Sequence, residues 1–261
     1  MSPNAVLWIL VLLAAGGAVG LVFYGEEQGW GGGLTVGLAV GLFFAAAIAY
    51  AVYDSARKRR RRQAAPEAAA LLGLIPAERS SLPHLPFELM SRGQGRTAEN
   101  AMAGNVDGAL WLFDYTYHTT SYNPNTNSTS RNDFYFSCAV GQLRAAGLPA
   151  MRISREGFFS RIGRAIGFED IEVGDRRFDA RFKVKASDPA VAGEVLHADL
   201  QRWLMALEEE MSFELADGLA LAYTKQRELT DLRPLLDALL AFRQQIPQAL
   251  LERYAANRTE A

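Results

Sequence analysis

The chain contains 261 residues, with 27 Lys and Arg against 29 Asp and Glu and a formal net charge of −2. This balance argues against a generally basic nucleic-acid-binding protein, so no nucleic acid partner is expected. One cysteine excludes a disulfide framework and a cysteine-based zinc site, and three histidines leave little material for a histidine-rich metal site. Of the basic residues only four are Lys and 23 are Arg, a usage typical of GC-rich bacterial genomes.

Two apolar runs without charged residues open the chain, at 5–24 and 34–53. Each run has the length, about 20 residues, that an α-helix needs to cross a bilayer core of about 30 Å. The short link between them, 25–33, predicts a transmembrane helical hairpin over residues 1–56. A cleaved signal peptide is the alternative for the first run, but residues 1–4 carry no basic side chain and a second span follows.

The charges around these runs predict an orientation. Six consecutive basic residues follow the second run, namely Arg57, Lys58, Arg59, Arg60, Arg61 and Arg62, whereas the link carries Glu26 and Glu27 and no basic residue. Because basic flanks stay in the cytoplasm, we predict a multi-pass protein of the inner (plasma) membrane with both termini cytoplasmic. The expected lipid partners are the bilayer and its anionic headgroups, which attract each basic residue near the surface by about 1 kcal/mol.

Small residues recur every four positions in the second run, and the first run offers two at the same spacing. These predicted helix-packing residues are Gly16, Gly20, Gly33, Gly37, Gly41 and Ala45. Small residues at this spacing let transmembrane helices approach each other closely. Packing of the two spans within one chain is favoured because the link is short, and self-association into a homo-oligomer is the alternative.

Behind the spans we expect a basic juxtamembrane segment and linker at 57–84 and a cytoplasmic domain at 85–261. The Ala-rich stretch 63–74 predicts a continuation of the second helix, interrupted near Pro66. Three further prolines punctuate the linker before the pattern changes to that of strands.

Three segments of the domain alternate apolar and polar residues as β-strands do, at 109–118, 134–140 and 178–186. The first two are expected to pair antiparallel. Such regular alternation predicts a sheet with one solvated face, which favours a mostly antiparallel arrangement. The dipeptides Asp107-Gly108 and Asp217-Gly218 predict two hairpin turns.

Helical periodicity predicts helices at 156–166, at 188–210 and from Thr230 onward, the last kinked near Pro247. Asp188-Pro189 is a typical pair for the cap and first position of a helix. The expected fold class is therefore α+β, with a two-helix transmembrane hairpin followed by a cytoplasmic domain that has a mostly antiparallel sheet and three or four helices.

The segment between the first two strands, 119–133, is predicted to be a long, mobile polar loop. Long loops on a rigid sheet are where binding residues concentrate. Tyr122 and Arg131 are its large side chains suited to anchoring a protein partner, and both residue types are common at binding hot spots. A tip without a role is the alternative.

Few signatures of chemistry occur in the chain. The glycine-rich stretch 93–96 lacks the flanking strand and helix of a dinucleotide loop and predicts a turn. His118 and Asp114, four residues apart on one strand, lie about 13 Å apart and form no dyad. The acidic cluster at 169–172 is expected to be solvated, and Cys138 to be buried and unreactive. We predict no catalytic, cofactor-binding or metal-binding residue and no cofactor.

Loose aromatic and apolar spacings run along the domain. They are Leu112-Phe113-x-Tyr115-x-Tyr117, Phe136-x-Cys138-x-Val140, Leu148-Pro149-Ala150 with Ile153, Glu156 and Phe158, Asp170-Ile171-Glu172, Phe178-x-x-x-Phe182-x-Val184, and Asp188. With the two spans, this pattern resembles a family of uncharacterised bacterial membrane proteins that have two N-terminal transmembrane helices and a cytoplasmic domain of unknown function. The resemblance covers the spans and residues 85–225 and implies this architecture but no activity.

These observations favour a membrane-anchored cytoplasmic interaction domain, such as a scaffold or sensor. An enzyme acting at the membrane surface is the alternative, and a small oligomeric channel or transporter component is the second alternative. The spans contain no ionisable side chain, and translocation pathways usually need one, which argues against the last of these.

Overall fold

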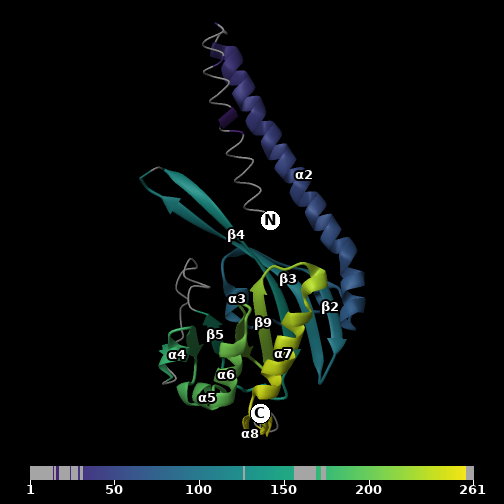
Figure 1. Ribbon diagram of the computed structural model, residues 1–261, viewed down its shortest axis with the longest axis vertical. Helices are drawn as coiled ribbons and strands as arrows, with labels where there is room; N and C mark the ends of the chain where they lie inside the picture. The colour runs from purple at the N-terminus through teal and green to yellow at the C-terminus, as the bar shows by residue number, and fades with distance from the viewer. Residues whose placement is uncertain are drawn as a thin grey trace. The chain divides into compact units, whose positions relative to one another are not determined.

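The computed structural model describes residues 14, 16–17, 24, 29, 32–125, 127–155, 169–171 and 175–256. The chain divides into two compact units, Met1–Gln63 and Ala64–Ala261. The sheet and all helices after α2 belong to the second unit (Figure 1). The predicted segment boundaries at 56 and 84 stay predictions.

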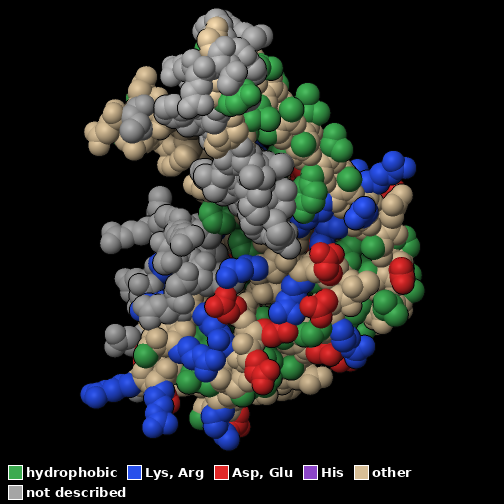
Figure 2. Space-filling view, turned by 45° about the horizontal axis from the view of Figure 1, so that its top comes forward, with side chains coloured by type: hydrophobic (Ala, Val, Ile, Leu, Met, Phe, Trp, Pro, Cys, Tyr) green, Lys and Arg blue, Asp and Glu red, His purple; other side chains and the backbone are tan. Residues whose placement is uncertain are grey.

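One long helix, α2 (Gly32–Leu72), runs through the predicted second span. Its apolar window has a mean hydropathy of 2.1 and is not buried, so among the described residues it is the one helix long and apolar enough to cross a membrane. Figure 2 shows hydrophobic side chains along this helix, and Phe44, Ile48 and Val52 each expose more than 60% of their surface. The predicted first span, 5–24, falls almost wholly outside the described residues, so one candidate span is shown where two were predicted.

The expected interruption of this helix near Pro66 does not occur. Instead, α2 continues through Pro66 as far as Leu72. A proline inside a helix removes one hydrogen bond and clashes with the carbonyl four residues earlier. Here the residues around it pack into the core of the second unit, namely Ala65, Ala68 and Ala69. Burial of these alanines stabilises the helix on both sides of the proline. The helix ends at Gly73, whose φ of 71° is the left-handed conformation that glycine adopts easily.

The described strands form a nine-stranded sheet in the order β1-β2-β3-β4-β9-β8-β5-β7-β6. They are β1 (Ile75–Pro76), β2 (Gln94–Asn105), β3 (Ala109–Asn123), β4 (Ser128–Gln142), β5 (Met151–Arg155), β6 (Glu169–Ile171), β7 (Phe182–Ala186), β8 (Ser212–Ala216) and β9 (Leu219–Lys225). Every neighbouring pair is antiparallel, which confirms the predicted sheet type and the α+β class. Both Asp-Gly turns connect strands as predicted, with Asp107 and Asp217 at φ of 52° and 48°.

The helices of the second unit are more numerous and shorter than the three or four that were predicted. After α2 they are α3 (Glu88–Ser91), α4 (Arg176–Asp179), α5 (Pro189–Val195), α6 (Ala198–Ala206), α7 (Arg233–Gln245) and α8 (Gln248–Ala256). The region 188–210 divides into two helices at Leu196, whose ψ of 44° leaves the helical region. Pro247 separates α7 from α8, which turns the expected kink into a break. The predicted helix at 156–166 lies outside the described residues.

The third predicted strand, 178–186, begins four residues too early. Asp175 accepts hydrogen bonds from the backbone N–H groups of Arg177 and Phe178, at 2.8 and 3.2 Å, and thereby caps the one-turn helix α4. The strand itself starts at Phe182. From there the predicted alternation holds, with Phe182 and Val184 buried and Lys183 exposed.

Both faces of the central strands are buried, which corrects the prediction of a solvated face. On one face, α5, α6 and α7 cover the larger core with residues such as Leu200, Leu239 and Phe242. On the other face a smaller core surrounds Phe113, and the segment 77–92 supplies its cover through Phe87, Leu89 and Met90. We call this segment the strap. The strap thus covers the aromatic face that alternation predicts to be apolar, while the opposite face of the same strands, with Leu110, Leu112 and Ala139, belongs to the larger core.

Candidate functional site

The β3–β4 hairpin continues beyond its neighbours in the sheet. β2 pairs with β3 only as far as His118, and β9 pairs with β4 only from Phe136. The segment 119–133, predicted to be a loop, consists instead of paired strand ends whose register runs from Thr119↔Asn132 to Asn123↔Ser128. We call this segment the ribbon; Figure 1 shows it projecting past the rest of the sheet.

The ribbon brings the two predicted contact residues onto one face. Thr120 lies opposite Arg131 and Tyr122 lies opposite Thr129, and directly paired residues of antiparallel strands point to the same side. Tyr122 exposes 61% of its surface, and the Arg131 side chain exposes 61% of its own. The two side chains are therefore diagonal neighbours on an open polar surface, which the sequence pattern alone did not indicate.

Local hydrogen bonds hold this ribbon in shape. The hydroxyls of Ser121 and Ser130 lie 2.6 Å apart across the two strands, and the Tyr122 hydroxyl donates to the Asn127 side chain at 2.7 Å. Arg131 donates to Asp133 at 2.9 Å. The ribbon is thus a hydrogen-bonded β-hairpin rather than the mobile loop that the sequence predicted.

The base of the ribbon is tightly packed around His118. Gly93 and Gly95 have φ of 59° and 61°, and a Cβ at Gly95 would lie 2.5 Å from the His118 ring. Residues 94–96 belong to β2, so the turn predicted at 93–96 is instead the start of this strand, and the close approach to His118 accounts for its glycines. Asp114 accepts a hydrogen bond from the side chain of Asn100 at 2.7 Å.

A second group of polar side chains is buried beneath the strap. Glu214, on β8, is 3% exposed and accepts hydrogen bonds from the backbone N–H groups of Glu88 and Leu89 at 2.6 and 3.2 Å. The Glu88 carboxylate in turn accepts from Arg92 and from Arg152 on β5. Two carboxylates and two guanidinium groups therefore meet between strap and sheet.

Burial dominates the electrostatics of this network. Desolvation, and then the negative charge of Glu88, raise the pKa of Glu214 to about 7 in spite of the opposing effect of Arg152. Desolvation also raises the pKa of Tyr117 to about 12 and holds the pKa of Tyr223 well above its ordinary value. Sequence reasoning missed this group, because Arg152 and Glu214 alternate with apolar neighbours as residues of a solvated face do.

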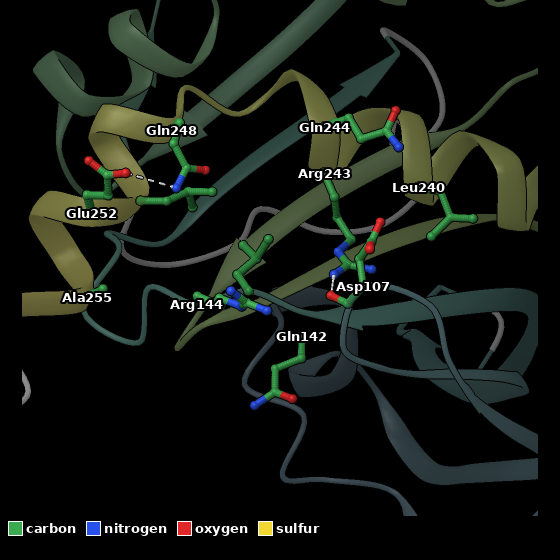
Figure 3. A pocket seen from close by; sticks show the side chains of 11 residues that line it. Asp107, Gln142, Arg144, Leu240, Arg243, Gln244, Gln248, Glu252 and Ala255 are labelled. Atoms are coloured by element: carbon green, nitrogen blue, oxygen red, sulfur yellow. Dashed lines mark hydrogen bonds between the residues drawn. The ribbon is translucent and has the colours of Figure 1, made fainter.

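A cavity of about 400 Å³ lies where α7 and α8 meet the ends of the strands. Arg243 donates to the backbone carbonyls of Val106 and Asp107 at 3.1 and 2.5 Å, and Gln248 donates to Glu252 at 3.1 Å. Figure 3 shows these side chains around the hollow, with Arg144 between them. The lining residues Arg243, Gln248 and Glu252 thus hold the helix corner together through contacts within the chain.

The remaining predicted positions are spread over other parts of the chain. Cys138 is buried as expected, and desolvation holds its pKa well above the ordinary value, while its predicted lack of reactivity stays a prediction. Glu169 and Asp170 pair with β7 as part of β6, whereas Glu172 lies outside the described residues. The described part of the chain holds no group of three or more His, Cys, Asp or Glu that could bind a metal ion.

The predicted membrane residues lie along α2 and beside it. The basic run 57–62 is wholly helical, and its Lys58 forms an ion pair with Asp54 at 2.8 Å, while Arg61 is buried. Among described atoms, none lies within 4 Å of a Cβ built at Gly16, Gly37 or Gly41, and it is Gly17 that approaches Leu42. Ala45 is exposed, Gly33 is helical, and Gly20 lies outside the described residues. The roles predicted for these residues stay predictions.

Comparison with known proteins gives a likeness of fold. No protein-family model and no curated protein sequence matches this chain. Its structure resembles the crystal structure of the mycobacterial trehalose monomycolate transport factor A, TtfA, with a TM-score of 0.50 and 13% sequence identity. The match covers 72% of this chain and 92% of that one. The structural resemblance is thus to a bacterial transport factor, and what the two chains share is the fold.

Proposed function

We propose that this chain is a membrane-anchored, cytoplasmic interaction protein that docks a protein partner through the ribbon. The observation that carries the proposal is the extension of β3 and β4 past every strand that pairs with them. Each of these strands has 15 residues, whereas strands of 5–6 residues are the most common. The extra length serves no core, because the ribbon residues 120–125 and 127–132 are exposed.

The surface chemistry of the ribbon suits a partner that is recognised through backbone and polar groups. An isolated two-stranded hairpin is only marginally stable in water, so a projecting one gains from being bound. Its outer edges offer backbone donors and acceptors to an added strand. Tyr122 and Arg131, side by side on one face, are of the types that dominate binding energies at interfaces.

The anchor supports a location at the membrane. α2 is apolar over its first part and carries the basic run 57–62 directly afterwards. We propose that this run meets anionic lipid headgroups on the cytoplasmic side and so orients the domain behind it. The fold likeness to a trehalose monomycolate transport factor makes a membrane transport assembly the class of partner that we propose.

Affinity capture of the full chain from native membranes, followed by mass spectrometry, tests this function. In the test variant Thr119 is joined to Asn132 by an Asn-Gly turn, which removes the ribbon and leaves the rest of the hairpin in register. The matched control is Arg202→Ser, because Arg202 is also exposed and ion-paired but lies on α6. A membrane transport protein should co-purify with the wild type and the control and be lost from the shortened variant. Unchanged partners in that variant, or recovery of further copies of this chain alone, would contradict the proposal.

A further inference from the structure

The strap contains little regular structure, although it covers an entire core. Between residues 77 and 92 it forms one 3-10 turn (Arg79–Ser81) and the single turn of α3. Phe87 and Leu89 are buried against the aromatic side chains of the sheet face, namely Phe113, Tyr115, Tyr117, Phe136 and Tyr223. A covering element of this kind is held by a few specific contacts rather than by a helix or strand of its own.

Those contacts concentrate at two places. At the first, Ala77 donates its backbone N–H to the Ala101 carbonyl at 2.8 Å. At the second, the Met90 carbonyl accepts from the Tyr115 hydroxyl at 3.1 Å and from Arg96 at 3.0 Å. Directly beside this point lies the buried network of Glu88, Arg92, Arg152 and Glu214. The network therefore sits where the strap is fixed to the sheet.

The two carboxylates of the network belong to opposite sides of this junction. Glu88 is on the strap and Glu214 is on the sheet, and the side chain of Glu88 is only 9% exposed. One Glu88 oxygen, Oε2, is buried and has no hydrogen-bond partner among the described residues. Two buried carboxylates in close proximity repel each other when both are charged, and a proton on one of them removes that repulsion.

We propose that this network is a proton-controlled latch. With one proton held by the pair Glu88 and Glu214, the strap stays closed over the aromatic face of the sheet. When that proton leaves, the strap loosens and the aromatic face becomes accessible.

The charged and titratable groups around Glu214 define the pH range in which the latch responds. Arg152 lies opposite it on β5, Tyr223 lies on β9, and Cys138 lies on β4, while the strap contributes Glu88 and Arg92. Tyr223 and Cys138 stay protonated because burial raises their pKa values, so Glu214 is the group of this network whose charge changes near neutrality.

The direction of the effect follows from linkage. Burial and Glu88 raise the pKa of Glu214 from 4.5 to about 7 in the closed state, so closing binds a proton. Closure is therefore favoured at low pH and is lost progressively as the pH rises through the closed-state pKa. With a pKa of 4.5 for the released carboxyl group, the closing equilibrium should weaken about tenfold between pH 6 and pH 8.

Hydrogen–deuterium exchange on the full chain in detergent micelles tests the proposal. Protection factors for strap peptides, corrected for the intrinsic exchange rate at each pH, should fall about tenfold from pH 6 to pH 8, while peptides from β9 keep theirs. Glu214→Gln keeps an acceptor for the strap N–H groups and cannot ionise, so its strap protection should be equal at both pH values. The matched control is Glu210→Gln, whose exposed side chain pairs with Lys225, and it should keep the tenfold change.

Two further measurements decide the case if a variant folds poorly. Glu88→Gln removes the repelling carboxylate and should reduce the pH effect on the strap to less than about threefold. Cys138 lies in the core beneath the strap, so at a fixed pH of about 7.4 a thiol reagent should label Glu214→Gln more slowly than the wild type. A wild-type strap whose protection is independent of pH, or a tenfold change that survives in Glu214→Gln, would overturn the proposal.

Discussion

Asn100 has a strained backbone conformation, and its side chain makes a buried hydrogen bond. Mutation can separate the contributions of these two features to the stability of the protein. Asn100 lies at the register shift between Glu99 and Met102 with φ of 53°, and it donates to Asp114, which is 3% exposed. A hydrogen bond to a charged group contributes about 1.5–3 kcal/mol. An L residue without a polar side chain costs about 1 kcal/mol at such a positive φ.

Asn100→Ala should therefore lower the free energy of unfolding by about 3 kcal/mol, since it loses the bond and keeps the strain. Asn100→Gly should cost about 2 kcal/mol, because glycine adopts this φ without strain but cannot donate to Asp114. Urea unfolding of the full chain in detergent micelles, followed by tryptophan fluorescence, measures both values. If Asn100→Gly is as destabilising as Asn100→Ala, the backbone is not strained; if it equals the wild type, the hydrogen bond contributes nothing.

Three other predictions concern packing, a turn and topology. Phe213→Ala removes a fully buried ring that contacts two other aromatic rings, and thermal unfolding should show a loss of about 3–5 kcal/mol. Gly218→Ala should destabilise the protein by at least about 2 kcal/mol in the same assay, because φ is 73° and the new Cβ would lie 2.9 Å from the Ala146 backbone; an unchanged midpoint would show that the turn can rearrange. A cysteine at Gln28 should react with an impermeant reagent in intact cells and one at Thr259 should not, and the reverse result would invert the proposed topology.

Strands whose two faces differ in composition could be predicted from the sequence. In 109–118 and 134–140 an aromatic and apolar face alternates with a more polar one, and the structure pairs these segments antiparallel as expected, although it buries both faces. The Asp-Gly turns were equally accessible, since the left-handed φ that they require restricts the residues that fit. In both cases a local rule determines the local structure.

The ribbon was not predicted as a pair of strands, because apolar–polar alternation arises only where a strand packs against a core. Where both faces of a strand are exposed, nothing selects alternating apolar residues, so 119–133 has the composition of a loop. The β-branched threonines at 119, 120 and 129 are compatible with strands, yet such a preference is weak on its own. The role predicted for Tyr122 and Arg131 stays a prediction, and their common face is what the structure adds.

The buried network was missed for a different reason. Glu88 and Glu214 are 126 residues apart, and each lies in a segment whose pattern is ordinary. Only the path of the strap across the sheet brings them together and removes them from water. Such long-range burial of charge is not encoded in any window of a single sequence.

The order of the strands has a consequence for folding of the chain while it is being synthesised on the ribosome. β4 has two neighbours: β3, which precedes it directly, and β9, which pairs Lys225 with Phe136 and is synthesised much later. Until β9 emerges, one backbone edge of β4 between Phe136 and Gln142 has no strand beside it, and the buried side chains there lack half of their packing. Pairings between distant segments form slowly, and an open apolar edge is a site of aggregation. The nascent chain should therefore depend on chaperones to keep this edge of β4 from aggregating until β9 has been synthesised.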